Sequence, residues 1–450
     1  MSRGPLRAAG QLLVALGLLE GCASHSERTL PVRTALDEGN APEAIRLLNE
    51  EMGVKADTDL PADLGSDNSL FVLDRGSIQQ SVAQFPSSKR DFEAADKAID
   101  MLDLAHGAKD SIGEYVFSGS SGKYQAPPYE KLLVNTLDMV NYLELRDLSG
   151  ARVEARRLAV MQRYVADDLH ETNNSVIGLG GFLAGLTFEE SDQADEALRW
   201  YDEALETAPS GALRDPVRRL LARAHYRTPR LDALAAGAPP PASLEAAGEG
   251  EVVFVVGYGR VPHKIAERVP IGLALTWFSG ALEPTDVAAA NRLAAQGLVT
   301  WINYPTLGPE QGGYELPSAS LDRGRVPLEE AVNVTREVRA EWKKIEGRII
   351  VSAITRMIAR YAAGSVVQAA AGQHDLLGTL LSLGTQATLT ALDRPDTRSW
   401  ETLPARVAIG RVRVPAGKHV VRLEARGAVR EVNVEVEKGG WAVVSLMSLR

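Results

Sequence analysis

The sequence predicts an α+β multidomain fold: an N-terminal array of α-helical hairpins, followed by a β-rich domain with a long helix and a C-terminal antiparallel β-sandwich. Three observations predict it. Apolar residues recur at three- and four-residue steps through the first half of the chain. The Ala-, Pro- and Gly-rich stretch 233–250 interrupts that pattern. After it, continuous and alternating apolar runs indicate strands.

A chain of 450 residues is expected to form two to four domains. We divide it as follows: 1–21 a signal peptide, 22–31 a lipidated leader, 32–232 the helical-hairpin domain, 233–250 a linker, 251–404 a mixed α/β domain, and 405–450 the C-terminal β-sandwich strands.

The N-terminus carries an export signal. Arg3 and Arg7 precede an apolar run over 12–19, which is too short to span a bilayer. The run ends in Leu19-Glu20-Gly21-Cys22, which resembles the lipobox of bacterial lipoproteins, although Glu20 is unusual in that motif. In that family the cysteine is lipidated, and Ala23 after it implies sorting to the outer membrane. The alternative is an ordinary signal peptide cut near Ala23.

Composition restricts the function classes. The net charge is −10, and removing Arg3, Arg7 and Glu20 with the signal leaves −11. This balance argues against nucleic-acid binding, which needs a basic face. It also argues against electrostatic adhesion of the whole chain to anionic lipid, so a lipid on Cys22, the only cysteine, would hold the protein at the membrane.

The predicted helices form hairpins at 34–52, with Gly39-Asn40 as the turn, at 69–104, interrupted by Pro86, at 129–165 and at 181–209. The last hairpin resembles the tetratricopeptide consensus, in which small residues stand where two helices touch and aromatic residues fill the space between them. The alternative is a plain helical hairpin. A stacked array of such repeats leaves a concave face for binding. The residues that carry the resemblance are Gly185, Phe188, Ala197, Tyr201, Ala204, Leu205 and Pro209.

The second half begins with a buried strand at 251–257. Strands are also expected at 266–277 and 298–304, and a helix at 328–346 that continues over 349–361. The apolar face of this helix can pack on the sheet or contact lipid. From 405 on, apolar residues alternate, with turns near 415–417 and 438–440. Residues 414–419 resemble the turn of PEGA-type envelope domains, which are accessory modules.

No motif in the sequence indicates chemistry. Gly257-Tyr258-Gly259 follows a strand, but Pro262 stands where a dinucleotide-binding turn needs its third glycine. Ser120 and Lys123 have the spacing of penicillin-interacting serine enzymes without the companion motifs. The histidines are scattered singly, without metal-ligand spacing. We therefore expect no catalytic residues, no cofactor and no metal.

The most distinctive non-helical stretch is Asp396-Thr397-Arg398-Ser399-Trp400. Asp396 can accept from the backbone or pair with Arg398. Trp400 is large enough to fix the junction between the long helix and the sandwich. We expect a structural corner here, with a binding role as the alternative.

This motif completes an ordered set that resembles an uncharacterised family of bacterial tetratricopeptide-containing outer-membrane lipoproteins. The set comprises the lipobox, Gly76 to Gln79, Asn141 to Leu143, Ala151 to Arg157, and Asp396 to Pro404. The resemblance implies an envelope role beside peptidoglycan synthesis. It identifies no catalytic residue.

The sequence thus suggests a non-enzymatic lipoprotein of the outer membrane that faces the periplasm and binds a protein partner through its helical array. One alternative is a cell-wall glycan-binding protein or an envelope enzyme acting through the β-rich half. That hypothesis requires a polar pocket near Trp400 or His263. Another is a structural subunit of an envelope assembly.

Overall fold

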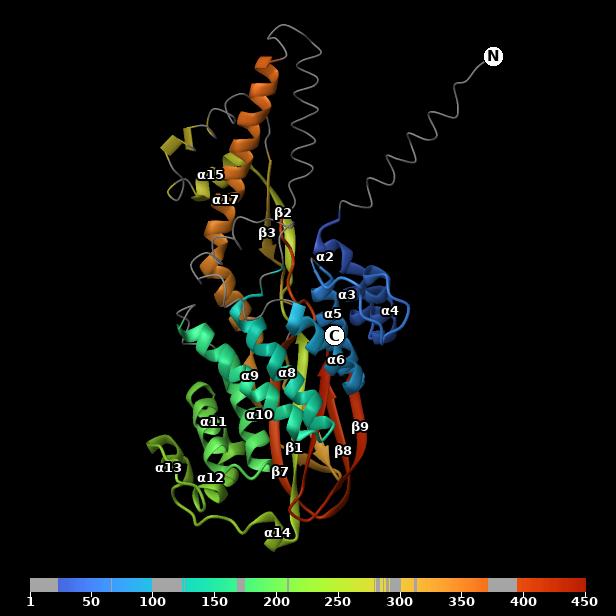
Figure 1. The fold of residues 1–450 in the computed structure, drawn as a ribbon, viewed down its shortest axis with the longest axis vertical. Helices are drawn as coiled ribbons and strands as arrows, with labels where there is room; N and C mark the ends of the chain where they lie inside the picture. The colour runs from blue at the N-terminus through green and yellow to red at the C-terminus, as the bar shows by residue number, and fades with distance from the viewer. Residues whose placement is uncertain are drawn as a thin grey trace, which may run out of the picture.

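The computed structural model describes residues 23–65, 67–98, 124, 126–167, 175–208, 210–278, 280, 284–285, 287–288, 291, 301–310, 314–370 and 395–450. The expected signal peptide, Cys22 and Pro209 lie outside these residues. Helices fill the first half of the chain, and strands follow (Figure 1). The helices before the first strand are α2 (His25–Arg28), α3 (Leu30–Asp37), α4 (Ala41–Met52), α5 (Asn68–Ser81), α6 (Phe85–Ala98), α8 (Pro128–Glu144), α9 (Leu148–Asp167), α10 (Val176–Glu190), α11 (Ala194–Thr207), η2 (Gly211–Leu213), α12 (Arg214–Leu221), α13 (Pro229–Ala235) and α14 (Leu244–Ala247).

One kind of connector joins four helix pairs. Each connector has a residue with left-handed backbone: Gly39 at φ 76°, Ala83 at 59°, Arg146 at 57° and Asp192 at 58°. In each, the N–H of the next residue donates to the carbonyl five residues earlier, as in a Schellman motif. This connector turns the chain back, so the hairpins expected at 34–52, 129–165 and 181–209 are present as α3/α4, α8/α9 and α10/α11.

The strands form two four-stranded sheets and one separate pair. The inner sheet has the order β10-β1-β7-β6, the outer sheet has the order β5-β4-β8-β9, and β2 pairs with β3 alone. The strands are β1 (Glu249–Arg260), β2 (Lys264–Pro270), β3 (Trp301–Leu307), β4 (Ser318–Leu321), β5 (Gly324–Val326), β6 (Glu329–Asn333), β7 (Pro404–Pro415), β8 (Gly417–Ala425), β9 (Ala428–Val436) and β10 (Trp441–Ser448).

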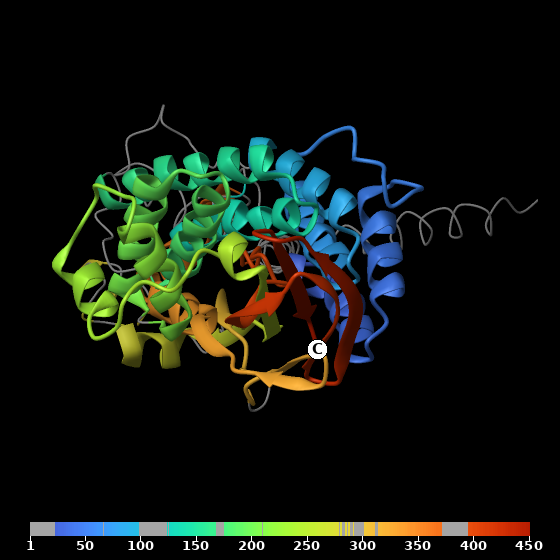
Figure 2. The same cartoon turned by 90° about the horizontal axis from the view of Figure 1, so that it is seen from below.

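The continuous apolar run of β1 is buried on both faces. Val253 and Val255 belong to the core shared with the helices, whereas Val252, Phe254 and Val256 belong to the core between the two sheets. Side chains of a strand alternate between its faces, so helices, inner sheet and outer sheet are three successive layers. Viewed along the long axis, the helices form an arc around the strands (Figure 2).

The helices that line this arc on the inside have no solvent face. Residues of α5, α8 and α10 are buried around nearly the whole circumference of each helix. α5 and α8 contact β10, and α10 contacts β6. A helix that is buried all round belongs to a core. The outer helices α4, α6, α9 and α11 each keep one exposed face.

The expected antiparallel C-terminal sandwich needs correction. β10 runs parallel to β1, with Glu251 opposite Trp441 and Tyr258 opposite Ser448. The turn at 437–440 carries the chain from the outer to the inner sheet instead of closing a hairpin. β1 lies between β10 and β7, so strands from 249–333 and from 404–448 complete each other's sheets.

Three local expectations are also wrong. The leader expected over 22–31 is helical from His25 and buried in part. The strand expected at 266–277 ends at Pro270, and α15 (Ile271–Phe278) follows. The helix expected from 328 begins only at Val334, because β6 takes residues 329–333 into the inner sheet.

A projection, which we call the arm, consists of β2, β3, α15 and α17 (Val334–Ala370). α17 has 37 residues and is therefore about 55 Å long. The arm has a small core of its own, to which β2, α15, β3 and α17 contribute, including Ile271, Ile302 and Ile354. Figure 1 shows α15 and the upper part of α17 well beyond the three layers.

Candidate functional site

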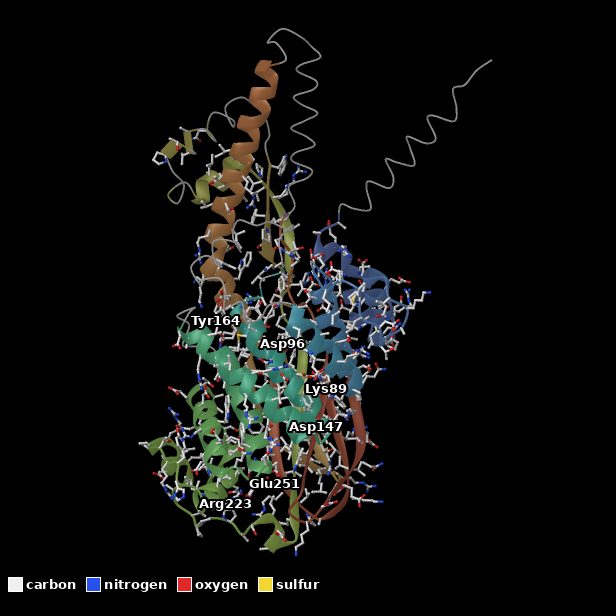
Figure 3. The ribbon with its side chains drawn as sticks, viewed as in Figure 1. Lys89, Asp96, Asp147, Tyr164, Arg223 and Glu251 are labelled. Atoms are coloured by element: carbon white, nitrogen blue, oxygen red, sulfur yellow. The ribbon has the colours of Figure 1, made fainter. Side chains whose placement is uncertain are left out.

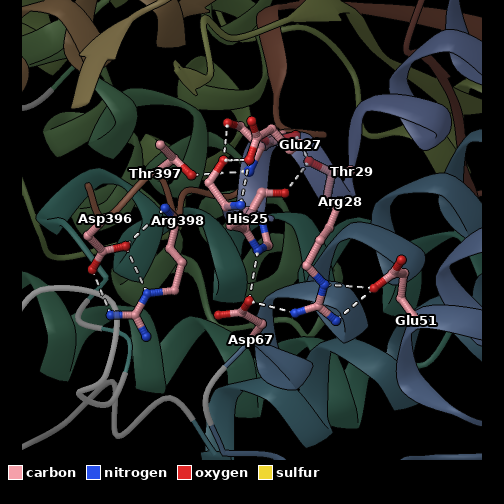
Figure 4. Close-up of polar contacts among 12 residues, drawn as sticks. His25, Glu27, Arg28, Thr29, Glu51, Asp67, Asp396, Thr397 and Arg398 are labelled. Carbon is pink, nitrogen blue, oxygen red and sulfur yellow. Dashed lines mark hydrogen bonds and ion pairs between the residues drawn. The ribbon is translucent and has the colours of Figure 1, made fainter. Parts of the chain in front are cut away.

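The chain is folded from the first residues after Cys22. Ser24 caps α2, because its N–H and its hydroxyl both donate to Glu27 Oε2, at 2.7 and 2.9 Å. The ring of His25 is buried and stacks on Phe71 with 5.2 Å between centroids. The N–H of Ser26 donates to Thr397 Oγ1 at 3.1 Å (Figure 4). Ala23 alone therefore separates the predicted lipidation site from the folded body.

Charged groups fasten this N-terminal segment to the helices behind it. Arg28 donates to Glu51 at 2.8 Å and to Asp67 at 3.0 Å, and its guanidinium lies 4.7 Å from the centroid of Phe71. Burial by itself lowers the pKa of His25, but Asp67 and neighbouring carboxylates outweigh it and raise that pKa above its usual value. Asp67 thus contacts both His25 and Arg28, as Figure 4 shows.

A second ion pair joins the segment to the stretch 396–404. Arg33 donates to Glu401, and both side chains are buried. Thr29 Oγ1 donates to the same Glu401 oxygen at 2.8 Å, and Arg33 donates to the carbonyl of Ser26 at 2.7 Å. A buried ion pair is costly to break once formed. The N-terminal helices are therefore held to a segment more than 360 residues away in the chain.

The expected pairing within 396–404 is confirmed. Asp396 accepts from the Arg398 backbone N–H at 3.0 Å and from its guanidinium at 2.9 and 2.6 Å. The bidentate arrangement fixes the corner through which the chain enters this segment.

Trp400 is completely buried, so it has no surface to offer a ligand. Its indole N–H donates to Ser77 Oγ at 3.0 Å, and its ring meets Phe92 edge-on with 5.6 Å between centroids. Its backbone N–H donates to Glu130 at 3.1 Å. The structural corner that we expected is observed, but Trp400 fixes the segment to α5, α6 and α8, and not to the long helix.

Two carboxyl groups in this junction have raised pKa values. Asp74 accepts from the N–H and the hydroxyl of Thr402 at 3.1 and 2.8 Å. Burial, followed by the charge of Glu401, raises the pKa of Asp74 to about 7. Burial likewise raises the pKa of Glu130 despite its bond from Tyr124. The junction is thus an extended buried polar network.

The five hairpin residues lie together as the spacing predicts. A Cβ on Gly185 would fall 2.3 Å from the ring of Tyr201, so only glycine permits this approach of α10 and α11. Ala197, Tyr201, Ala204 and Phe188 are all buried. They therefore make helix packing and are not exposed for a partner. The likeness to the tetratricopeptide repeat itself stays a prediction.

Tyr201 also enters an ion-pair cluster between the helices and the inner sheet. Its hydroxyl donates to Glu189 at 2.7 Å and accepts from Arg411 at 3.0 Å. Arg411 also pairs with Glu251, which Figure 3 labels on β1. Arg219 pairs with Glu251 at 2.7 Å and with Glu189 at 3.2 Å. The cluster joins α10 and α12 to β1 and β7.

This cluster contains the three carboxylates that meet the geometry of a cation site among the described residues: Glu189, Glu190 and Glu251. Burial and the charge of Glu189 raise the pKa of Glu190 to about 8, so Glu190 is mostly protonated at neutral pH. Two guanidinium groups then balance two carboxylates. Arg411 and Arg219 supply the positive charge that a metal would bring, and we assign the cluster a structural role.

The concave face expected to bind a partner is covered by the protein itself. The inner sheet occupies the inside of the helical arc, and Val255, Ile409 and Val443 belong to one core with α5, α8 and α10. The physical reason is that α5, α8 and α10 have no continuous polar face that could remain in water. The inner sheet therefore covers the side of these helices that points into the arc. The hypothesis that a partner binds in that face is therefore wrong.

Among the described residues, the surfaces left for binding are the outer helices, the exposed face of the outer sheet and the arm. α9 exposes Val153 and Val160, at 44% and 45%, with Arg156 and Arg163 on the same face. A hollow of about 610 Å³ lies on residues 52–62. Neither surface has the grouped acids or nucleophiles of a catalytic site.

No protein-family model matches the chain, and neither a curated protein nor a solved structure matches it. The assignment of a function therefore depends on the geometry described above.

The buried polar network was missed from the sequence. Asp74 and Glu130 stand at positions that a helical pattern leaves open to either solvent or core. One clue was available: α8 carries Asn135, Asp138 and Asn141 at three-residue steps among apolar residues, so some polar groups had to be buried with partners.

Proposed function

We propose that this protein is a non-enzymatic lipoprotein that faces the periplasm from the outer membrane and acts as a rigid scaffold for a protein partner. The observation that carries the proposal is the position of the first folded residue. Ser24 is the N-cap of α2 and is buried. A lipid on Cys22 would therefore hold the body directly at the membrane surface. One extended residue spans only about 3.5 Å.

This arrangement favours a membrane-surface role over a long-range one. A lipoprotein that reaches across the periplasm needs a flexible spacer after its cysteine. Here the ion pairs of Arg28 and Arg33 fix the N-terminal segment to α4, α5 and the stretch 396–404. The body therefore keeps a defined orientation relative to its anchor, which suits a scaffold that presents one surface to a partner.

The exposed face of α9 is the partner surface that we favour. It combines two exposed valines with Arg156 and Arg163, and apolar contacts ringed by arginine are common at protein interfaces. The partner would carry an apolar and acidic patch. The family resemblance implies partners in peptidoglycan synthesis or envelope assembly.

Processing tests the anchor. The chain with Cys22 is expected to accumulate as an unprocessed precursor in cells treated with globomycin, and Cys22→Ser is expected to remain unprocessed without it. Globomycin-insensitive processing, or a Cys22→Ser chain that is still cut to the mature length, contradicts lipidation at this residue.

Photo-crosslinking tests the partner surface. A photoreactive residue at position 160 is expected to give a defined adduct in the envelope, and Val153→Asp in the same chain is expected to abolish it. Val429→Asp is the matched control, because Val429 is 50% exposed on the outer sheet. If the adduct survives Val153→Asp and disappears with the control, the α9 assignment is refuted.

A further inference from the structure

The arm carries a charge pattern that the overall acidic balance hides. Over its first four turns, the charged residues of α17 with exposed side chains are all cations. They are Arg336, Arg339, Lys343, Lys344 and Arg348. The acids of this stretch, Glu337, Glu341 and Glu346, are partly buried, and Glu341 pairs with Lys344 at 3.2 Å while Glu337 lies 3.8 Å from Arg336. Arg339 pairs with Glu310 at 3.3 Å. We call these five cations the basic band.

The basic band ends at Arg348, and apolar residues follow. Most of them, including Ile350, Ile354 and Met357, are buried in the core of the arm, and Val351 and Ile358 are partly exposed. From Ile349 to Ile358 the described side chains of α17 include one charged residue, Arg356, which donates to Ser352 Oγ at 2.7 Å. Beside them lies α15, with the sequence Ile-Gly-Leu-Ala-Leu-Thr-Trp-Phe, in which Leu273 is 44% exposed. Within the described residues, no helix of the protein is long and apolar enough to cross a membrane.

Aromatic and basic groups meet at the level of this change. Arg268 on β2 lies over the ring of Trp301 at 5.2 Å, and Trp301 is partly exposed. Tryptophan and arginine with apolar stems favour the boundary between headgroups and acyl chains. Arg268 and Trp301 therefore form a pair of the kind that such a boundary favours.

The arm also stands beside the predicted anchor. α2, the helix next to Cys22, contacts β2 at the base of the arm. In Figure 1, α15 and the upper part of α17 lie beyond α2 along the long axis of the molecule. Since only Ala23 separates α2 from Cys22, a membrane that holds the lipid meets the arm before any other part of the protein.

We propose that the arm is a second membrane contact, in which the basic band binds anionic lipid headgroups and the exposed Leu273 of α15 reaches the acyl chains of the adjoining leaflet. This inference rests on the proposed lipid anchor for its orientation. Lipid is the occupant that fits, because the basic band is complementary to anionic headgroups and is continuous with the anchored end of the protein. One basic residue near an anionic surface contributes about 1 kcal/mol.

Site-specific fluorescence tests the depth of the arm. Cys22 is the only cysteine of the chain, and acylation blocks its thiol. Thr355→Cys on the exposed face of α17 therefore gives one site for an environment-sensitive dye, and Lys438→Cys gives a matched site at the far end of β1. The anchored protein is reconstituted in vesicles of phosphatidylethanolamine and phosphatidylglycerol, with and without brominated acyl chains.

We expect the dye at position 355 to shift to the blue and to be quenched by the brominated lipids, while the dye at 438 stays in water. Equal, water-like spectra at both positions refute the proposal. A blue shift at 355 that appears without vesicles shows that protein, from a second copy, covers the arm, and it refutes the proposal as well.

A second experiment does not need the anchor. The full chain with Cys22→Ser is floated with the same vesicles, with phosphatidylcholine vesicles as the neutral comparison. Binding to the anionic vesicles is expected to fall roughly a hundredfold when Arg336, Lys343 and Arg348 are changed to Glu, on the basis of about 1 kcal/mol for each lost cation. Leu273→Asp is expected to weaken binding to both kinds of vesicle.

These results separate the two proposals. If Cys22 is not acylated, the dye labels two thiols and the proposed lipid anchor is refuted. Flotation of the Cys22→Ser chain still tests whether the arm binds lipid. If the protein is acylated and neither flotation nor quenching responds to the arm, the anchor stands and the arm proposal is overturned. All substituted positions are exposed, and unchanged melting temperatures verify folding.

Discussion

Replacing Asp74 with Asn should make the protein more stable at neutral and alkaline pH. The Asp74 carboxyl is 2% exposed, and only Oδ1 has described partners, both from Thr402. Oδ2 has no hydrogen-bond partner among the described residues. A neutral acid suits this site, whereas a carboxylate is buried at a cost. Asparagine has the shape and the neutrality of the protonated acid.

The magnitude follows from the pKa of Asp74, which burial and the charge of Glu401 raise from 3.8 to about 7. Below the unfolded value near 3.8 both states hold the proton, and Asp74 does not favour unfolding. As pH rises from about 4 to about 7, the unfolded chain loses the proton first, so the stability of the folded state falls. Roughly three pH units at 1.36 kcal/mol each give ~4 kcal/mol.

Urea unfolding from pH 4 to 9 measures this difference. The free energy of unfolding of Asp74→Asn minus that of the natural chain should rise between pH 4 and 7 and then stay level. Asp147→Asn is the control, because bonds from Ser149 and Gly150 lower the pKa of Asp147. Its stabilising contribution is lost only below about pH 4, so its difference from the natural chain should stay level over this range. A difference for Asp74→Asn that does not change with pH would refute the reasoning.

Three further substitutions test packing and charge. Trp400→Ala should cost about 3–5 kcal/mol in urea unfolding, and Trp400→Phe distinctly less, because Phe keeps most of the packing; equal losses would contradict the edge-on packing against Phe92. Gly185→Ala should cost about 1–3 kcal/mol by pushing Tyr201 away, with a lower melting temperature as the readout. Glu190→Gln should leave stability unchanged near pH 4 and raise it progressively between about pH 4.5 and pH 8, since burial and the charge of Glu189 raise the pKa of Glu190 from 4.5 to about 8 in the folded chain; a loss at pH 7 would show that the charged form is needed.

The helical hairpins were predictable because each is determined by residues that are close together in the sequence. Gly185 and Tyr201, for example, are separated by enough residues for the chain to turn back and bring them into contact. A glycine opposite an aromatic residue fits two helices that pack closely at that point. The pairing of Asp396 with Arg398 is local too. Such features depend on neighbours in the sequence, where periodicity and side-chain size carry the information.

Contacts distant in the chain were not predictable in this way. Nothing in β1 indicates that β10, almost 200 residues later, will pair with it in parallel. Similarly, the segment from Ser24 to Thr29 has the polar composition of a leader. Its burial depends on Thr397 and Glu401, which lie 371 and 372 residues after their partners in this segment. Residues 329–333 have no helix-breaking residue, yet they complete the edge of a sheet.

Covering of the inner helices changes what the helical array can do. An open array binds its partner with the concave face, and that face must then be polar enough to stay in water without the partner. In this protein α5, α8 and α10 are too apolar for that, and β1, β7 and β10 complete them within the same chain. The array therefore cannot release its sheet to bind something else without exposing the core. Recognition is left to the outer helices, the exposed face of the outer sheet and the arm, and the inner strands act as the permanent partner that keeps them in a fixed position relative to the N-terminus.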